Sequence, residues 1–460
     1  LKRHGRAQHF CQDAALGLAR FNQPPVFGAT GCVGDRFEPA TSHGASSPSG
    51  QGRLLAWLEP NRMAVGASEQ LCYYWLRMFK SFKYRLFPSR AQERLLSQTL
   101  ETCRRWYNTC LEERKTAWEE RRESVGKYAQ LRKVKYLKAT SPYAAPVHSH
   151  ILQVVAQDLD KAFQAFFRRV QAGETPGYPR FKSRDRFHSF GLKEYGNGFK
   201  LDGRRLKVSG IGRIAVRWHR PLESEVSTVR LVRKAGKWYA CFGCEVEARL
   251  LPSTGQEVGI DVGLHHLAAL SNGETIENPR WYRAEQARLR VLQRRVSRRK
   301  LAGSNRRKAV ASLQRQHERI ANRRQDYLNQ LAHDLIVRYD RIALENLQIK
   351  NMVRNRHLAK SILDAGWSYL KQHLTHKAEG AGRVVYLVNP AHTSDTCSQS
   401  GTVFENLTLA DRWVSCVCGL SLDRDVNAAL NIVHRAGQAH WGQTWPVPAT
   451  ASVPQEAAPL

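Results

Sequence analysis

The chain has 460 residues and carries 72 Lys and Arg against 40 Asp and Glu, a formal net charge of +32. Its length allows two or three domains with real cores, and so large a basic excess favours a nucleic acid partner over a merely solvated surface. The ten cysteines do not form the dense framework of a small secreted domain. We therefore expect an intracellular protein with mostly free thiols. No apolar run reaches about 18 residues, so we expect no membrane-spanning helix.

Residues 1–77 differ in composition from the rest of the chain. They are rich in Gly, Ser, Pro and Ala and show neither helical nor strand periodicity, which predicts a disordered or linker segment. At Met78 an alternating, strand-like pattern begins. We therefore expect residues 1–77 to be an upstream extension and the functional protein to start at Met78.

From Ser89 onward the apolar residues take helical spacing. A first helix is expected after Ser89, a second at about 128–139 and a third over 149–172. The third carries the aromatic residues Phe163, Phe166 and Phe167. Their helical spacing favours a helical core over a surface for base stacking.

A loop over 173–187 mixes basic and aromatic residues, including Arg180, Lys182 and Arg184. This mixture suits contact with a nucleic acid backbone together with base stacking. Strands are then expected at 198–208, 212–216, 226–234 and 237–247. The last of these contains Cys241 and Cys244, which alternation places on opposite faces, so we interpret them as packing thiols rather than metal ligands.

Asp261 ends an apolar strand that begins at Glu257. A charge there is costly unless it is paired or bound to a metal ion, although an acid at an exposed sheet edge explains the pattern equally well. Gly259 and Gly263 flank the acid, and we interpret them as room for a phosphate or an ion near the backbone.

The segment 282–308 is strongly basic, with a narrow apolar stripe that predicts one amphipathic helix. A long helix follows, through about Arg338. A solvated face or a membrane-surface helix is the alternative, but a groove for a nucleic acid backbone suits both helices better. The residues expected to contact phosphates here are Arg294, Arg295, Arg298, Arg299 and Lys300.

Two further carboxylates follow. Glu345 ends the apolar strand that starts at Arg341, and Asp425 stands at the start of an amphipathic helix. Three carboxylates can converge on a pair of divalent cations about 4 Å apart, and oxygen ligands favour Mg²⁺ or Mn²⁺. The sequence therefore predicts that Asp261, Glu345 and Asp425 are metal-binding catalytic residues.

Taken in order, the motifs Gly-Ile-Asp261-Val-Gly, Leu-Glu345-Asn-Leu, Thr393-Ser-x-x-Cys397, Cys418-Gly and Asp423-Arg-Asp425-Val-Asn resemble those of the TnpB family. These are transposon-encoded, RNA-guided nucleases related to type V CRISPR effectors, and the resemblance covers about Met78 to Arg435. It implies a mixed α+β and α/β multidomain fold. A wedge-type β-barrel would span 78–255, with a helical recognition insert over about 89–172. An RNase H-like RuvC nuclease domain would span 256–436, with its basic helical region at about 282–338, and 437–460 would be a flexible tail.

The resemblance also implies Mg²⁺-dependent cleavage of double-stranded target DNA, directed by a guide RNA, in the cytoplasm of a prokaryotic cell. The expected zinc ribbon over about 392–420 departs from the family, which has two CxxC pairs. Here the pairs read Cys397-Ser-Gln-Ser400 and Ser415-Cys416-Val-Cys418. Only Cys397 and Cys418 align, and Cys416 is displaced by one position. Zinc binding by this degenerate ribbon is thus left open. Two alternatives also stay open, a nuclease-impaired RNA-guided DNA-binding protein acting as a repressor, and a decayed transposon product.

Overall fold

The computed structural model describes residues 77–405, 407–408 and 410–438. The expected upstream extension over 1–77 and tail over 437–460 lie almost entirely outside this range. The described residues form two compact units: 110–127 with 156–181, and 77–109 with 128–155 and 182–438. None of the helices within the described range is both long and apolar enough to cross a membrane.

The smaller unit contains the C-terminal part of α2 (Arg90–Arg121), from residue 110 on, and most of α4 (Ser149–Gln171). Phe163 and Phe166 of α4 are buried, and each meets the ring of Tyr178 edge-on with 5.5 Å between ring centroids. Arg114 of α2 forms an ion pair with Asp160 of α4 at 3.1 Å. The α4 aromatic residues thus form core, as their helical spacing predicts. The next helix, α3 (Lys127–Thr140), belongs to the larger unit except for its first residue.

The larger unit contains a seven-stranded antiparallel sheet in the order β2-β6-β7-β1-β5-β4-β3. On β1 every second side chain is buried, namely Phe82, Tyr84 and Leu86, as the alternating sequence predicts. The strands are β1 (Arg77–Phe87), β2 (Ser189–Leu192), β3 (Phe199–Asp202), β4 (Arg205–Val208), β5 (Gly212–Arg217), β6 (Val226–Lys234) and β7 (Lys237–Glu247).

One strand expectation is wrong. The segment 198–208 is not a single strand but the hairpin of β3 and β4, because Gly203 and Arg204 form a turn in which Gly203 has a φ of +55°. On β7 the expectation holds: Cys244 is buried and Cys241 is half-buried, and both are free thiols. Burial raises the pKa of both thiols, as expected for packing residues.

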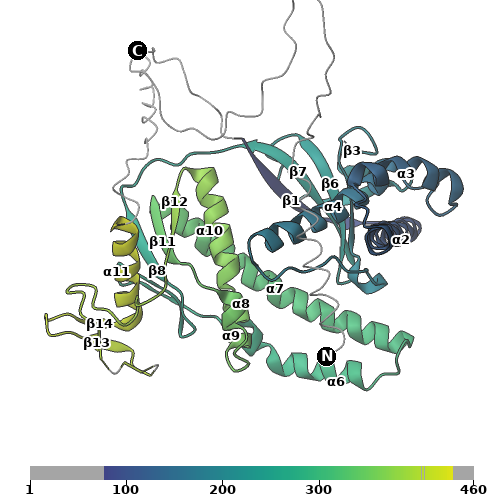
Figure 1. Ribbon diagram of the computed structural model, residues 1–460. Helices are drawn as coiled ribbons and strands as arrows, with labels where there is room; N and C mark the ends of the chain where they lie inside the picture. The colour runs from purple at the N-terminus through teal and green to yellow at the C-terminus, as the bar shows by residue number, and fades with distance from the viewer. Residues whose placement is uncertain (1–76, 406, 409, 439–460) are drawn as a thin grey trace, which may run out of the picture. The chain divides into compact units, whose positions relative to one another are not determined.

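The larger unit also contains a five-stranded mixed sheet in the order β10-β9-β8-β11-β12, of which Figure 1 labels β8, β11 and β12. Its central strands, β8 (Glu257–Asp261) and β11 (Arg341–Glu345), run parallel, and β12 (Val384–Val388) runs parallel to β11. β9 (His266–Leu270) and β10 (Thr275–Glu277) complete the sheet in antiparallel pairing. A separate hairpin pairs β13 (Trp413–Ser415) with β14 (Ser421–Asp423).

Helices cover the two faces of this sheet. On one face Val258, Ile260, Ile342 and Leu344 pack with residues of α7 (Ser304–Arg338) and α10 (Trp367–Ala381) in one large core. On the other face Ala343 and Val388 pack against α11 (Arg424–Ala436). Figure 1 shows α11 beside the strands β8 and β11. The shorter helices are α5 (Trp281–Ala284), α6 (Gln286–Ser297), α8 (Ile349–Met352) and α9 (Ala359–Ala365).

The basic segment 282–308 is not one helix, contrary to the expectation. It divides into the end of α5, all of α6 and the start of α7, with a turn over 298–303. In that turn Ala302 has a φ of +63°, which cannot continue an α-helix. Arg298, Arg299 and Lys300 therefore lie in the turn rather than on the helix. Taken together, the chain has the mixed α and β architecture that the motifs predict.

Candidate active site

Asp261 and Glu345 lie at the carboxyl ends of the two central parallel strands. The register pairs Ala343 with Gly259 and Leu344 with Ile260, so Glu345 and Asp261 follow side by side. Because side chains alternate along a strand, these two acids share the face of Gly259 and Ala343, which is the face that α11 covers. Asp261 is on an interior strand, which rules out the alternative of an exposed sheet edge.

Asp425 approaches the same place from α11. It occupies the first turn of the helix, and the neighbouring Asp423 caps the helix by accepting hydrogen bonds from the N–H groups of Asp425 (2.8 Å) and Val426 (3.2 Å). A β-carbon at Gly263, two residues after Asp261, would lie 3.8 Å from Asp425 Oδ2. The two acids of the Asp423-Arg-Asp425 motif thus have separate tasks, because one caps the helix while the other faces the strand ends.

The electrostatics of the three carboxylates is typical of a cation site. Burial raises the pKa of Asp261 to about 8, and the charges of Glu345 and Asp425 add to this shift. Burial also raises the pKa of Glu345, although the Thr393 hydroxyl and Arg435 oppose the shift. Since like charges in a poorly solvated site repel one another, a bound cation would favour the ionised forms of Asp261 and Glu345.

Sequence reasoning did not assign a role to Thr393, yet its side chain touches the site. Thr393 is 1 % exposed, and its hydroxyl donates a hydrogen bond to Glu345 Oε1. Asn431 of α11 donates to the backbone carbonyl of Thr393 at 2.9 Å. Asn427 of α11 accepts from the N–H of Ser398 (2.9 Å) and donates to the carbonyl of Thr396 (2.7 Å). The segment 393–398 is thereby held against both Glu345 and the helix of Asp425.

Gly259 has a different role from the one its position suggests. A β-carbon there would meet the carbonyl oxygen of Ala429 at 2.0 Å and the nitrogen of Val433 at 2.9 Å, both on α11. The interpretation of Gly259 as room for a phosphate or ion is therefore wrong, because the backbone of α11 fills that space. The glycine is what lets the helix approach the strand.

The cysteine motifs fold into two turns that face each other. In the first turn Gly401, at φ +76°, donates its N–H to the carbonyl of Cys397. In the second, between β13 and β14, Gly419, at φ +94°, donates its N–H to the carbonyl of Cys416. The thiols of Cys397, Cys416 and Cys418 lie within 4.8 Å of one another. Cys416 therefore joins the cluster despite its displacement in sequence, because the tight turn brings residues 416 and 418 to the same side.

The geometry of this cluster is compatible with a metal ion. Cys397 Sγ and Cys418 Sγ are 3.6 Å apart, and Cys416 Sγ lies 3.3 Å from the Ser400 hydroxyl. A zinc tetrahedron with bonds of about 2.3 Å has edges of about 3.8 Å. Burial raises the pKa of Cys397, but hydrogen bonds from Ser400 outweigh it and lower the pKa to about 6, which favours the thiolate that metals bind. His392 is engaged with Asp395 instead, at 2.9 Å.

The predicted nucleic-acid-binding residues lie on two separate segments. Arg294 and Arg295 on α6, and Arg298, Arg299 and Lys300 in the following turn, are all exposed and have no ion-pair partner among the residues described. In the other segment Arg180 and Arg184 are exposed. Lys182 is half-buried because its backbone is bonded to the side chains of Asn108 and Arg104 of α2.

Comparison with known proteins identifies the family. The family model OrfB_IS605, described as "Probable transposase", matches residues 242–356. A protein of Streptomyces pristinaespiralis is 36% identical over 371 residues, which is 77% of this chain and 88% of the relative. The chain belongs to the TnpB family, also named OrfB/IS605. A second relative in this family, InsQ of Escherichia coli (strain K12), is 31% identical over 79% of this chain and 94% of its own length. Both relatives carry the name "Putative RNA-guided DNA endonuclease".

Other TnpB-related models match the two ends of the described chain. The Cas12f1-like TNB domain matches 367–432, which includes the three cysteines and Asp425. A model described as a helix-turn-helix domain matches 78–123, where the structure forms the strand β1 and the single long helix α2. The solved complex of Cas12f1 with guide RNA and target DNA contains a chain that is 14% identical, with a TM-score of 0.53 over 77% of this chain and 98% of that one. This last likeness concerns the fold alone.

Proposed function

We propose that this TnpB-family chain is an RNA-guided DNA endonuclease that depends on Mg²⁺ or Mn²⁺, with Asp261, Glu345 and Asp425 as its catalytic residues. The observation that carries the proposal is the meeting of three carboxylates on one face of the five-stranded sheet, at the ends of two parallel strands and the start of α11. The names of the relatives support the guide RNA and the DNA substrate.

The donor set fits hard divalent cations. Three carboxylates supply oxygen ligands only. Burial raises the pKa of Asp261 most and the charges of Glu345 and Asp425 add to the shift, and a divalent cation would relieve this repulsion. When bound, such cations would activate a water molecule and stabilise the leaving 3′-oxygen of the phosphodiester.

The chain's own residues would prepare this site. Asp261 and Glu345 present their carboxylates from rigid parallel strands. Thr393 holds one oxygen of Glu345 with its hydroxyl and so limits the rotation of that carboxylate. Asp425 is held at the helix start because Asp423 caps α11. Exposed arginines of α6 and its turn would bind the nucleic acid backbone, and base pairing with the guide would read the sequence.

We assign residues 78–255 to a wedge-type barrel with the helical insert and 256–436 to a RuvC-like nuclease domain. The seven-stranded sheet and the five-stranded sheet, respectively, support this division. The Cys397, Cys416 and Cys418 cluster would hold zinc, with Ser400 or an external donor in the fourth position. Zinc analysis of the purified chain tests this: about one zinc per chain in the native protein and loss in Cys416→Ser are expected, whereas a metal-free native protein would contradict it.

The decisive test is DNA cleavage by the purified full chain with RNA from its own transposon end, matched duplex DNA and Mg²⁺. Asp261→Asn and Asp425→Asn should abolish cleavage and spare RNA-guided binding, because only metal ligation is lost. Asp334→Asn is the matched control, since its carboxylate on α7 is 58% exposed. Equal cleavage by the Asp425 variant would refute its assignment, and binding without any cleavage by the native chain would favour a repressor instead.

A further inference from the structure

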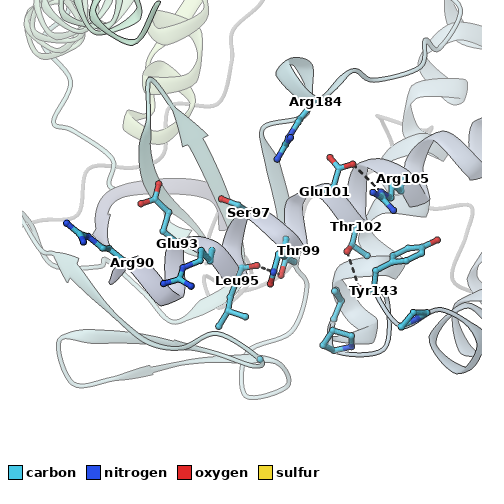
Figure 2. A pocket seen from close by; sticks show the side chains of 16 residues that line it. Arg90, Glu93, Leu95, Ser97, Thr99, Glu101, Thr102, Arg105, Tyr143 and Arg184 are labelled. Carbon is cyan, nitrogen blue, oxygen red and sulfur yellow. Dashed lines mark hydrogen bonds and ion pairs between the residues drawn. The ribbon is translucent and has the colours of Figure 1, made fainter. Parts of the chain in front are cut away.

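A hollow of about 870 Å³ lies on the larger unit (Figure 2), and its lining includes neither the three carboxylates nor the cysteine cluster. One wall is a stripe of α2 that presents Arg90, Arg94, Gln98, Glu101 and Arg105 at a spacing of three or four residues. The other wall is the loop 142–147, and Arg184 closes the hollow from the basic loop. We call this feature the α2 groove.

The α2 groove carries unpaired positive charge. Arg90, Arg94 and Arg184 are exposed, and none of them has an ion-pair partner among the residues that the structure describes. Figure 2 shows Arg184 directed toward α2. The loop that carries Arg184 is fixed, because the Asn108 side chain both accepts from the N–H of Lys182 (2.8 Å) and donates to its carbonyl (3.1 Å). Three guanidinium groups on fixed elements suit phosphate groups of one strand.

An aromatic ring stands in the same groove. The Tyr143 side chain is 44% exposed, and the Arg105 guanidinium lies 5.3 Å from the centre of its ring. The buried Thr102 donates to the backbone carbonyl of Tyr143 at 3.1 Å and so fixes the loop to α2. A ring held in place beside a guanidinium, with free surface remaining, is a platform on which an unpaired base can stack.

The acids of the groove favour RNA over DNA. Glu101 is neutralised by Arg104 and Arg105, at 2.6 and 3.2 Å. Glu93 has no ion-pair partner within the described part of the chain. A free carboxylate repels phosphates unless a hydroxyl or N–H group donates to it, and the 2′-hydroxyl of RNA supplies such a donor at every residue.

We propose that the α2 groove binds a single-stranded segment of RNA, with phosphates on Arg90, Arg94 and Arg184 and a base stacked on Tyr143. The proposal rests on the proposed function in taking the guide RNA as the source of the strand. The groove would thus hold an unpaired part of the guide RNA on residues 90–184, which precede Asp261, Glu345 and Asp425 in the chain.

The test is fluorescence anisotropy of the full chain with labelled single-stranded RNA and with DNA of the same length and base sequence, over a series of salt concentrations. Replacing Arg90, Arg94 and Arg184 by Gln should reduce the steepness of log Kd against log salt for RNA by about 2, since each phosphate contact on a single strand contributes about 0.7. Replacing Arg204, Arg205 and Lys207 by Gln is the matched control, because these exposed residues on and beside β4 lie outside the groove.

The ring is tested separately. Tyr143→Ala should weaken RNA binding about five- to a hundredfold, and Tyr143→Phe should retain it. Tyr136→Ala, which removes a ring that is 70% exposed on α3, should have no effect. Glu93→Ala should raise the affinity for DNA more than that for RNA.

An unchanged salt dependence in the triple arginine variant would overturn the proposal, as would equal affinity of the native chain for RNA and DNA. If the native chain cleaves guided DNA while the groove variants bind RNA normally, the groove assignment fails and the proposed function stands. If the native chain binds no RNA at all, both fail.

Discussion

Gly259 offers a direct test of how the carboxylates are brought together. In Gly259→Ala the new β-carbon would lie 2.0 Å from the carbonyl oxygen of Ala429 on α11. An ordinary contact is about 3.5 Å, so the helix and strand would have to separate by roughly 1.5 Å. The carbonyl oxygen of Ala429 belongs to the helix backbone and the new β-carbon is bonded directly to the strand backbone. Neither atom can rotate away from the other.

The expected cost has two parts. Overpacking of this kind destabilises a core by about 1–3 kcal/mol, and occasionally by more. Asp425 moves with α11, and a displacement of about 1 Å in a catalytic group can reduce the rate about a hundredfold. Gly259→Ala should therefore lower both the free energy of unfolding and the rate of guided DNA cleavage.

Denaturant unfolding and the cleavage assay measure these two effects. A lower midpoint with an unchanged slope would show lost stability without a change in the surface exposed on unfolding. Gly126→Ala is the matched control, because a β-carbon there has no heavy atom within 4 Å. If Gly259→Ala unfolds and cleaves like the control, the close approach of α11 to β8 does not hold the site.

Three further predictions concern other contacts. Thr393→Val keeps the shape of the side chain but removes the hydroxyl that donates to Glu345. The Mn²⁺ concentration for half-saturation, measured by direct metal titration, should therefore rise about 10–100-fold, while Thr393→Ser should keep the native value. Equal metal affinity in the native chain and both variants would refute the positioning role of Thr393. Asp340 is partly buried, but hydrogen bonds from Ser253, Thr254 and Gly255 outweigh burial and lower its pKa to about 2, and Arg383 pairs with it at 2.6 Å. Because the pKa of Asp340 is lower in the folded protein, the ionised carboxylate stabilises the fold by about 2 kcal/mol above about pH 4, and this contribution is lost as the pH falls toward 2. Asp340→Asn should therefore lower the denaturant midpoint at pH 7 and reduce the acid sensitivity of unfolding. An unchanged dependence of the midpoint on pH would argue against this role of Asp340. Replacing Arg294, Arg295, Arg298 and Arg299 by Gln should reduce the slope of log Kd against log salt for duplex DNA by about 3.6, at 0.9 for each phosphate contact, and an unchanged slope would place the segment outside the nucleic acid path.

Several features could be predicted from the sequence because they depend on local patterns. Short apolar runs identified the strands that end in Asp261 and Glu345, and helical spacing identified the aromatic core of α4. The order of the motifs identified the TnpB family, which the relatives confirm. The hairpin at 199–208 and the break in the basic helix were missed, because single turns at Gly203 and Ala302 interrupt patterns that are otherwise continuous.

The sequence by itself thus determined which carboxylates lie at strand ends and at a helix start, because apolar periodicity and helix capping depend on residues that are close in the sequence. Only the tertiary structure decided what surrounds them. Gly259 allows α11 to approach the strand β8, and the Thr393 hydroxyl donates a hydrogen bond to Glu345. The Cys416 thiol lies in one cluster with the thiols of Cys397 and Cys418. Each of these depends on contacts between residues distant in the chain, whose distances are fixed by the packing of whole elements rather than by local spacing.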